Sequence, residues 1–114
     1  MCGLAGILTQ TSSNCEDSLR KMGRSLVHRG PDDEGIWMDP TAGIGLAHQR
    51  LSVIDLSSEG RQPMSSASGR YVIAYNGEVY NFLELRKKLD HAGGSQWRGH
   101  SDTEVILAAI EKWG

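Results

Sequence analysis

The sequence predicts an α+β domain in which short strands and helices follow one another without a regular strand–helix–strand repeat. The chain has 114 residues, which is about the length of one domain. Three segments carry apolar residues at helical spacing, and short apolar runs typical of strands lie between them. Because these runs do not alternate one by one with the helices, the pattern does not favour a parallel α/β architecture.

The composition is that of an ordinary globular domain, with 39% hydrophobic and 23% charged residues. The net charge of −2 gives no sign of a nucleic-acid-binding face. No apolar run has the length of a membrane span, and the N-terminal run lacks the positive region of a signal peptide. Without a secretory signal, we expect the two cysteines, Cys2 and Cys15, to be free thiols in the cytoplasm.

The first elements are a buried strand over Leu4–Leu8, a closing polar run over Thr9–Asn14 and a helix over Glu16–Val27. The apolar residues that predict the helix form one stripe: Leu19, Met22, Leu26 and Val27. We expect the helix to end at the run 28–31, where glycine and proline both stop helices.

In the middle of the chain, a strand over Gly35–Met38 turns at Asp39-Pro40, and Gly43–Ile54 forms one or two strands. This last stretch mixes apolar residues with polar ones, namely His48, Gln49 and Arg50. Residues 55–70 are rich in serine, glycine and proline, which predicts a long surface loop. Loops of this length in a compact domain often carry function.

The following strand is predicted over Arg70–Tyr75, and Asn76-Gly77 after it is a strong signal of a type I′ hairpin turn into 78–80. A helix over Asn81–His91 has one apolar face, made of Phe82, Leu85 and Leu89. Ser101-Asp102-Thr103-Glu104 has the form of a capping box. It opens a helix over Thr103–Trp113, whose expected buried residues are Val105, Ile106, Ala109 and Trp113.

Cys2 has a chemistry that an internal cysteine lacks. If Met1 is removed, Cys2 carries both a thiol and an α-amine. The reference pKa is about 8.5 for the thiol and about 7.7–8.0 for the α-amine. The amine is then a base for the thiol, directly or through a water, as in N-terminal nucleophiles. The simpler interpretation is that Cys2 is a small residue behind the initiator methionine.

Other residues supply what a nucleophile needs, and each also has a simpler interpretation. Asn76 and Gly77 form either a plain turn or an oxyanion hole, the Asn76 amide and the Gly77 N–H donating to a developing oxygen. Arg50 is either a solvated strand residue or a planar fork for a carboxylate. Asp102 either complements a helix dipole or accepts hydrogen bonds from an ammonium group, and Glu78 is a hairpin residue or a second ammonium contact.

Several other kinds of site find no support in the sequence. The four histidines lack the close pairing of a zinc site, and there is no Cys-x-x-Cys pair. There is no nucleotide-binding GxxxxGK[ST] loop and no G-x-S-x-G elbow of a serine hydrolase. The remaining signals together fit one ligand: an amino acid with a side-chain amide.

Six runs of the sequence together resemble the glutaminase domain of asparagine synthetases (glutamine-hydrolysing), which are class II glutamine amidotransferases. These runs are Met1–Ile7, His28–Gly35, Gly45–Ser57, Gln62–Met64, Tyr75–Asn81 and Ser101–Glu104. The residues Pro31-Asp32-Asp33, which follow His28-Arg29-Gly30, are more similar to those of asparagine synthetases than to those of other amidotransferases. Gln49 is a small departure, since these synthetases often carry a second arginine there.

The resemblance implies an N-terminal nucleophile hydrolase fold, an αββα sandwich of which residues 1–114 are the N-terminal part. It implies that Cys2 attacks the glutamine side-chain amide and that Asn76 and Gly77 form the oxyanion hole. It further implies that Arg50 binds the α-carboxylate. The remaining implied contacts are the backbone of Leu51, Val53 and Ile54 beside that carboxylate, and Glu78 and Asp102 at the α-amino group.

The resemblance also implies a synthetase domain beyond these residues that binds ATP and Mg²⁺ and converts aspartate to asparagine. No Ser-Gly-Gly-x-Asp-Ser loop occurs here, so we expect no cofactor and no metal on this chain. The expected partners are L-glutamine, the synthetase domain and, through exposed sheet edges, a second copy in a homodimer. Two alternatives stay open: an amidotransferase acting on another carboxylate, such as a sugar acid, and a non-catalytic regulatory domain of the same fold.

Overall fold

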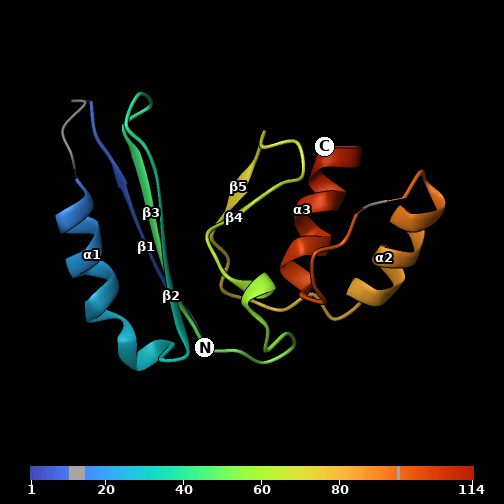
Figure 1. Ribbon diagram of the computed structural model, residues 1–114, viewed down its shortest axis with the longest axis horizontal. Helices are drawn as coiled ribbons and strands as arrows, with labels where there is room; N and C mark the ends of the chain where they lie inside the picture. The colour runs from blue at the N-terminus through green and yellow to red at the C-terminus, as the bar shows by residue number, and fades with distance from the viewer. Residues whose placement is uncertain (11–14, 95) are drawn as a thin grey trace.

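A computed structural model describes residues 1–10, 15–94 and 96–114, which form two parts side by side (Figure 1). The first part is an antiparallel three-stranded sheet covered by one helix, and the second is a two-stranded sheet with two helices. This is a mixed α and β domain with antiparallel sheets, as the sequence predicts. The expected polar run after the first strand falls mostly on 11–14, outside the described residues.

The sheet of the first part has the order β1-β3-β2, with β3 in the centre. Its strands are β1 (Gly3–Leu8), β2 (Asp33–Asp39) and β3 (Ile44–Arg50). The predicted strands at both edges of this sheet form, and each is longer than expected. The prediction that the first strand is buried is wrong in part, because Leu4 and Leu8 are exposed. The predicted stretch 43–54 forms one strand, which ends at Arg50, so residues 51–54 are free to form a loop.

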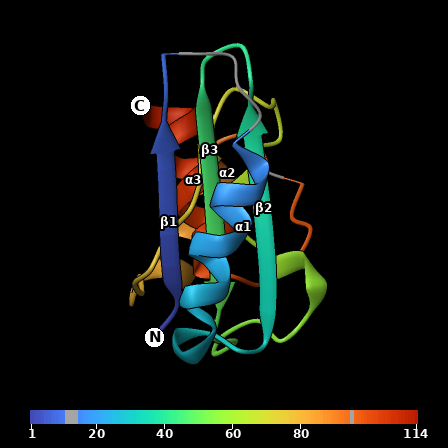
Figure 2. The same cartoon turned by 90° about the vertical axis from the view of Figure 1, so that its left-hand side faces the viewer.

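Helix α1 (Glu16–Ser25) lies over β3 on one face of this sheet (Figure 2). Leu19 is completely buried there, and Gly23 faces the sheet, since a Cβ on it would lie 3.6 Å from the Cβ of Ala47. The helix ends two residues before the predicted Val27 and continues as a 3₁₀ turn, Val27–Arg29. Met22 and Val27 are exposed, because only the side of the helix around Leu19 faces the sheet.

The alternation of side chains along β3 determines where the polar residues point. Ala47 and Gln49 face α1, since both lie next to Gly23. Successive residues of a strand face opposite sides, so His48 and Arg50 face the second part of the molecule. Both are buried. The outer face of the first sheet, under α1, therefore carries Ala47 and Gln49, and the inner face carries the charged or ionisable His48 and Arg50.

The second part contains β4 (Met64–Ser65) paired antiparallel with β5 (Val72–Ile73), and helices α2 (Phe82–His91) and α3 (Asp102–Trp113). The prediction of a surface loop over 55–70 is wrong in part, because this stretch contains β4 and a 3₁₀ turn, Ser58–Gly60. A two-residue strand is too short to show an alternating pattern in the sequence. Met64 is nonetheless buried and belongs to the hydrophobic core.

The predicted hairpin turn at Asn76-Gly77 is wrong. A type I′ turn requires a positive φ at both central residues, and neither residue has one. In the described residues no strand follows at 78–80. The hairpin of β4 and β5 closes instead around Gly69, which has a φ of +75°, with the N–H of Ser66 donating to the Tyr71 carbonyl at 2.9 Å.

Helix α3 begins with half of the predicted capping box. Ser101 Oγ accepts from the Glu104 N–H at 3.2 Å, but the Glu104 carboxylate accepts from the Arg98 and Gly99 N–H groups. Val105 is completely buried, as predicted, whereas Trp113 is 52% exposed because the last turn of α3 leaves the core. Among the described residues, no helix has the length and apolar character that crossing a membrane requires.

Candidate active site

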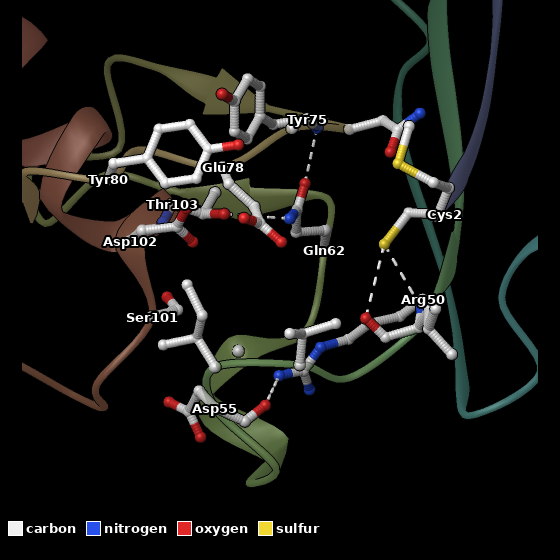
Figure 3. A pocket seen from close by; sticks show the side chains of 17 residues that line it. Cys2, Arg50, Asp55, Gln62, Tyr75, Glu78, Tyr80, Ser101, Asp102 and Thr103 are labelled. Carbon is white, nitrogen blue, oxygen red and sulfur yellow. Dashed lines mark hydrogen bonds between the residues drawn. The ribbon is translucent and has the colours of Figure 1, made fainter.

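A cavity of about 410 Å³ opens between the two parts, on the inner face of the first sheet. Every residue that the sequence predicts for the site lines this cavity: Cys2, Arg50, Leu51, Val53, Ile54, Asn76, Gly77, Glu78 and Asp102. Cys2 and Arg50 lie on one side, and Glu78 and Asp102 lie on the other (Figure 3). Residues far apart in the sequence thus meet in one pocket.

Cys2 precedes β1 and points into the cavity (Figure 3). The adjacent Gly3 faces α1, since a Cβ on it would lie 2.9 Å from the Cβ of Leu26. Cys2 Sγ accepts from the Leu51 N–H at 3.3 Å and donates to the Leu51 carbonyl at 3.7 Å. The thiol is half-buried, and both Cys2 and Cys15 are free. With Met1 in place the Cys2 nitrogen is a peptide nitrogen, which has no basic lone pair.

Arg50 is 7% exposed, so the interpretation as a solvated strand residue is wrong. Its guanidinium donates to the Ser57 carbonyl at 2.8 Å and to the Asp55 carbonyl. A guanidinium has five N–H donors in a planar fork, so it keeps further donors for a ligand in the cavity. Gly60 makes room for the group, because a Cβ there would lie 2.1 Å from Arg50 Nη2.

Asp55 lines the same cavity, and the sequence does not single it out. Its carboxylate accepts from Ser57 Oγ at 2.6 Å, from the Ser57 N–H at 2.8 Å and from the His100 N–H at 2.8 Å. Burial by itself would raise the pKa of Asp55, but these hydrogen bonds and the charge of Arg50 lower the pKa to about 2. The carboxylate therefore stays ionised and ties the loop after β3 to the residue before the α3 cap. No sequence pattern predicts this hydrogen bond, because His100 is 45 positions away from Asp55 along the chain.

Asp102 is buried at the first turn of α3, and its carboxylate reaches the opposite side of the cavity from Cys2 (Figure 3). It accepts from the Val79 N–H at 2.8 Å and from the Thr103 N–H at 2.9 Å. Each carboxylate oxygen has a second acceptor site, which leaves capacity for a cationic ligand. Glu78 is exposed and lines the cavity beside it.

The segment with Asn76 and Gly77 follows Tyr75, whose backbone is held by two buried side chains that the sequence does not assign. Gln62 Oε1 accepts from the Tyr75 N–H at 2.6 Å, while Gln62 Nε2 donates to Thr103 Oγ1 at 3.2 Å. His48 Nε2 lies 3.1 Å from the Tyr75 carbonyl, which can only accept, so this nitrogen carries the hydrogen. Gln62 lies in one of the runs that carry the resemblance, which is the only sequence signal for it.

Among the described residues, no three His, Cys, Asp or Glu side chains are placed to hold one metal ion. The chemistry that the pocket offers is that of a thiol, donors for a carboxylate and acceptors for an ammonium group. An α-amino acid carries these last two groups on one carbon, and its side chain is bonded to the same carbon.

Comparison with known proteins shows which family the chain belongs to. The glutamine amidotransferase domain family matches residues 1–114. The chain is 42% identical, over 99% of its length, to asparagine synthetase [glutamine-hydrolyzing] 1 of Bacillus subtilis. It is 37% identical, over its whole length, to putative asparagine synthetase [glutamine-hydrolyzing] 2 of Methanocaldococcus jannaschii. It is also 31% identical over its whole length to a protein named amidase chry2 from Gibberella zeae.

The chain spans about a fifth of the length of these curated relatives: 18%, 24% and 18%, respectively. The family match covers every residue of the chain, and the relatives align along its whole length or nearly so. The chain therefore belongs to the glutamine amidotransferase domain family.

Proposed function

We propose that this chain hydrolyses the side-chain amide of L-glutamine to glutamate and ammonia, with Cys2 as the nucleophile. The observation that carries the proposal is the single cavity lined by Cys2, by Asn76 and Gly77, by Arg50 and by Asp102. These residues come from four separate stretches of the chain.

In the proposed reaction the Cys2 sulfur attacks the amide carbon, and a carbon–sulfur bond forms while the carbonyl oxygen becomes negatively charged. The Asn76 side-chain amide and the Gly77 N–H stabilise this oxygen by donating hydrogen bonds. The carbon–nitrogen bond then breaks, and the nitrogen leaves as ammonia after taking a proton. Water attacks the resulting thioester, which releases glutamate and restores the thiol. The α-amine of Cys2, once Met1 is removed, accepts and returns the protons.

The other end of glutamine explains the charged residues of the cavity. Arg50 binds the α-carboxylate through the donors that the loop leaves available, and the backbone of Leu51, Val53 and Ile54 borders the same site. Asp102 and Glu78 accept hydrogen bonds from the α-ammonium group. Because Asp102 and Arg50 lie on different elements, the two charges of an amino acid fix its orientation toward Cys2.

We infer that residues 1–114 are the N-terminal part of an αββα sandwich of the N-terminal nucleophile hydrolase type. Two features support this: α1 covers the outer face of the first sheet, and the cavity lies on its inner face. The β4–β5 sheet and its helices then begin the second half of the sandwich, whose remaining strands belong to the rest of the domain.

For the whole protein we propose a cytoplasmic ligase that passes the ammonia to aspartate, activated by ATP and Mg²⁺ on a synthetase domain, and so makes asparagine. The asparagine synthetase names of several relatives support this product. Exposed Leu4 and Leu8 on the edge strand β1 support self-association into a homodimer. A relative of another name, amidase chry2, supports the alternative of a different acceptor, since a similar domain occurs there too.

The test is ammonia release from L-glutamine by the full-length protein, prepared with Met1 removed and with Met1 retained, as checked by intact mass. We expect activity only in the processed form, because only that form has a basic α-amine. Equal activity of the two forms would contradict the role of the amine. A processed protein that releases no ammonia would contradict the proposed function itself.

A further inference from the structure

We propose that His48 and Gln62 are positioning residues that hold the backbone of Tyr75 and thereby set the oxyanion donors of Asn76 and Gly77 at their distance from Cys2. This inference rests on the proposed function, because it assigns how one part of that site is built. We call the two side chains the Tyr75 clamp.

The backbone of Tyr75 is held by side chains instead of a strand ladder. Strand β5 ends at Ile73, two residues earlier, so Tyr75 has no ladder partner in the part of the chain that the structure describes. Its N–H donates to Gln62 Oε1 at 2.6 Å, and its carbonyl accepts from His48 Nε2 at 3.1 Å. Fixing both backbone groups of one residue limits the rotation of the peptide that leads to Asn76. The clamp therefore determines the direction in which the Asn76–Gly77 segment leaves β5.

Both clamp residues are anchored on the sheet that carries Cys2. His48 lies on the central strand β3 and pairs with Leu4, two residues after Cys2 on β1. On its other side His48 pairs with Gly35 of β2, and the Gln62 backbone lies against this glycine. A Cβ on Gly35 would come within 1.9 Å of the Gln62 carbonyl oxygen. The oxyanion segment is thus tied to the strand pair behind the nucleophile, across the gap between the two parts.

A buried histidine at position 48 costs more free energy than an apolar side chain that only fills the core. The side chain is 1% exposed, and its Nδ1 has no hydrogen-bond partner among the described residues. A buried polar atom without a partner costs free energy that leucine at this position would avoid. What the imidazole supplies is the Nε2–H donor to Tyr75. Burial lowers the pKa of His48, and the charge of Arg50 lowers it further, against the opposing effects of the Tyr75 carbonyl and Asp33, so the ring favours the neutral form.

A displaced oxyanion hole has a characteristic kinetic effect. Its donors act on a charge that is present only in the transition state, so their loss lowers kcat while substrate binding is kept. Removal of one such donor typically lowers kcat by about 10²–10³-fold. A residue that merely stabilises the fold lowers the amount of folded protein and leaves the kcat of the folded molecules unchanged.

The experiment measures glutamine hydrolysis by the full-length, Met1-processed protein carrying His48→Leu or His48→Gln. We expect His48→Leu to lower kcat by about 10²-fold with the KM for glutamine within about twofold of the original. His48→Gln keeps a side-chain N–H for the Tyr75 carbonyl. We expect the kcat of His48→Gln to be at least about tenfold higher than that of His48→Leu. His91→Leu, on the exposed end of α2, is the matched control and should leave kcat unchanged.

The second arm replaces Gln62 and remains informative if His48→Leu does not fold. Gln62→Met removes the acceptor for the Tyr75 N–H and should lower kcat with KM kept, whereas Gln62→Glu keeps an acceptor oxygen and should recover activity. Thermal unfolding reports the folded fraction of each variant. The inference is wrong if folded His48→Leu and Gln62→Met keep their kcat, if kcat and KM change together, or if both variants fail to fold. Absence of activity in the unmodified protein would instead refute the proposed function.

Discussion

The guanidinium of Arg50 orders a loop, and in the proposed function it also binds the substrate carboxylate. Its hydrogen bonds to the Ser57 and Asp55 carbonyls hold the 51–57 loop against β3, and Cys2 Sγ touches that loop at Leu51. The same contacts pre-orient the fork, which lowers the entropy lost when a ligand binds. The position of the carboxylate site and that of the nucleophile are therefore linked through one side chain.

Gly60→Ala tests this arrangement of Arg50. The new Cβ would lie 2.1 Å from Nη2, so the guanidinium has to move and lose its loop contacts. We expect the KM for glutamine to rise about 10-fold or more, which corresponds to one charge-assisted hydrogen bond. Steady-state kinetics provide the measurement. The control is Gly6→Ala, whose Cβ meets Leu46 at an ordinary 3.5 Å; a similar KM in both variants would contradict the assignment.

Asp102→Asn tests the ammonium contact with less structural damage than removal of the side chain. The asparagine oxygen still accepts from the Val79 N–H, so the 77–80 segment keeps its anchor. The negative charge is lost, and we expect glutamine to bind about 10–100-fold more weakly to a Cys2→Ala background, as measured by calorimetry. An unchanged binding constant would refute the contact.

At the residue scale, the sequence predicts which side chains line the pocket but not what holds them. Cys2, Arg50 and Asp102 belong to runs with recognisable chemistry. Asp55, Gln62 and His48 act through hydrogen bonds to backbone groups far away in the sequence, and such partners are determined by the tertiary fold. No local pattern encodes them.

Helix α3 brings Asp102 to the cavity, and its N-terminus is the element that matters most for the site. Ser101 accepts from the Glu104 N–H at 3.2 Å, while the Glu104 carboxylate binds the N–H groups of Arg98 and Gly99. These contacts fix both the start of the helix and the loop that enters it. These contacts therefore determine the position of Asp102, which lies in the first turn.

Ser101→Ala should therefore lower the free energy of unfolding by about 1 kcal/mol, because one buried N–H loses its cap. Urea unfolding followed by circular dichroism measures the change. Ser18→Ala, at an exposed position of α1, serves as the comparison and should not destabilise the protein. Equal stability of both variants would show that the cap contributes nothing to α3.

Elements with long periodic patterns are predictable from this sequence, and elements made by tertiary contacts are not. The three helices and the strands of the first sheet have enough residues to show a helical or an alternating pattern. Strand β4 has two residues, and its pairing with β5 depends on Gly69 closing the turn. The Asn76-Gly77 signal fails because β5 ends at Ile73 and the backbone of Tyr75 is bonded to Gln62 and His48, so no pair of strands flanks a turn there.

In the molecule as a whole, some of the contacts beside the cavity also join the two parts. Asp55 links the loop after the first sheet to the start of α3 through His100, and His48 on β3 donates to the Tyr75 carbonyl of the second part. The cavity therefore lies where these contacts join the two parts.

Asp55 makes the stability of the whole molecule sensitive to acid. Its pKa is lowered to about 2 in the folded state from an ordinary value of 3.8. A lowered pKa means that its contribution is fully present above about pH 4 and is lost as the pH falls through about 2. This contribution is about 2 kcal/mol.

We expect Asp55→Asn to lose this stabilisation at neutral pH and its free energy of unfolding to depend less on pH between about 4 and 2. Urea unfolding across this range, with the exposed Asp17→Asn as control, checks the prediction; a parallel pH profile for Asp55→Asn and the original protein would contradict it.

The measurement that tests the central claim most directly is covalent labelling of the full-length, Met1-processed protein with a glutamine analogue that carries a diazoketone in place of the side-chain amide. Cys2 and Cys15 are both free thiols, so Cys15 is an internal control. Peptide mass spectrometry locates the adduct. We predict a label on Cys2, formed with the L-isomer and prevented by excess L-glutamine. Labelling of Cys15 to the same extent, or equal labelling by the D-isomer, would contradict the claim that Cys2 is the nucleophile of a glutamine site.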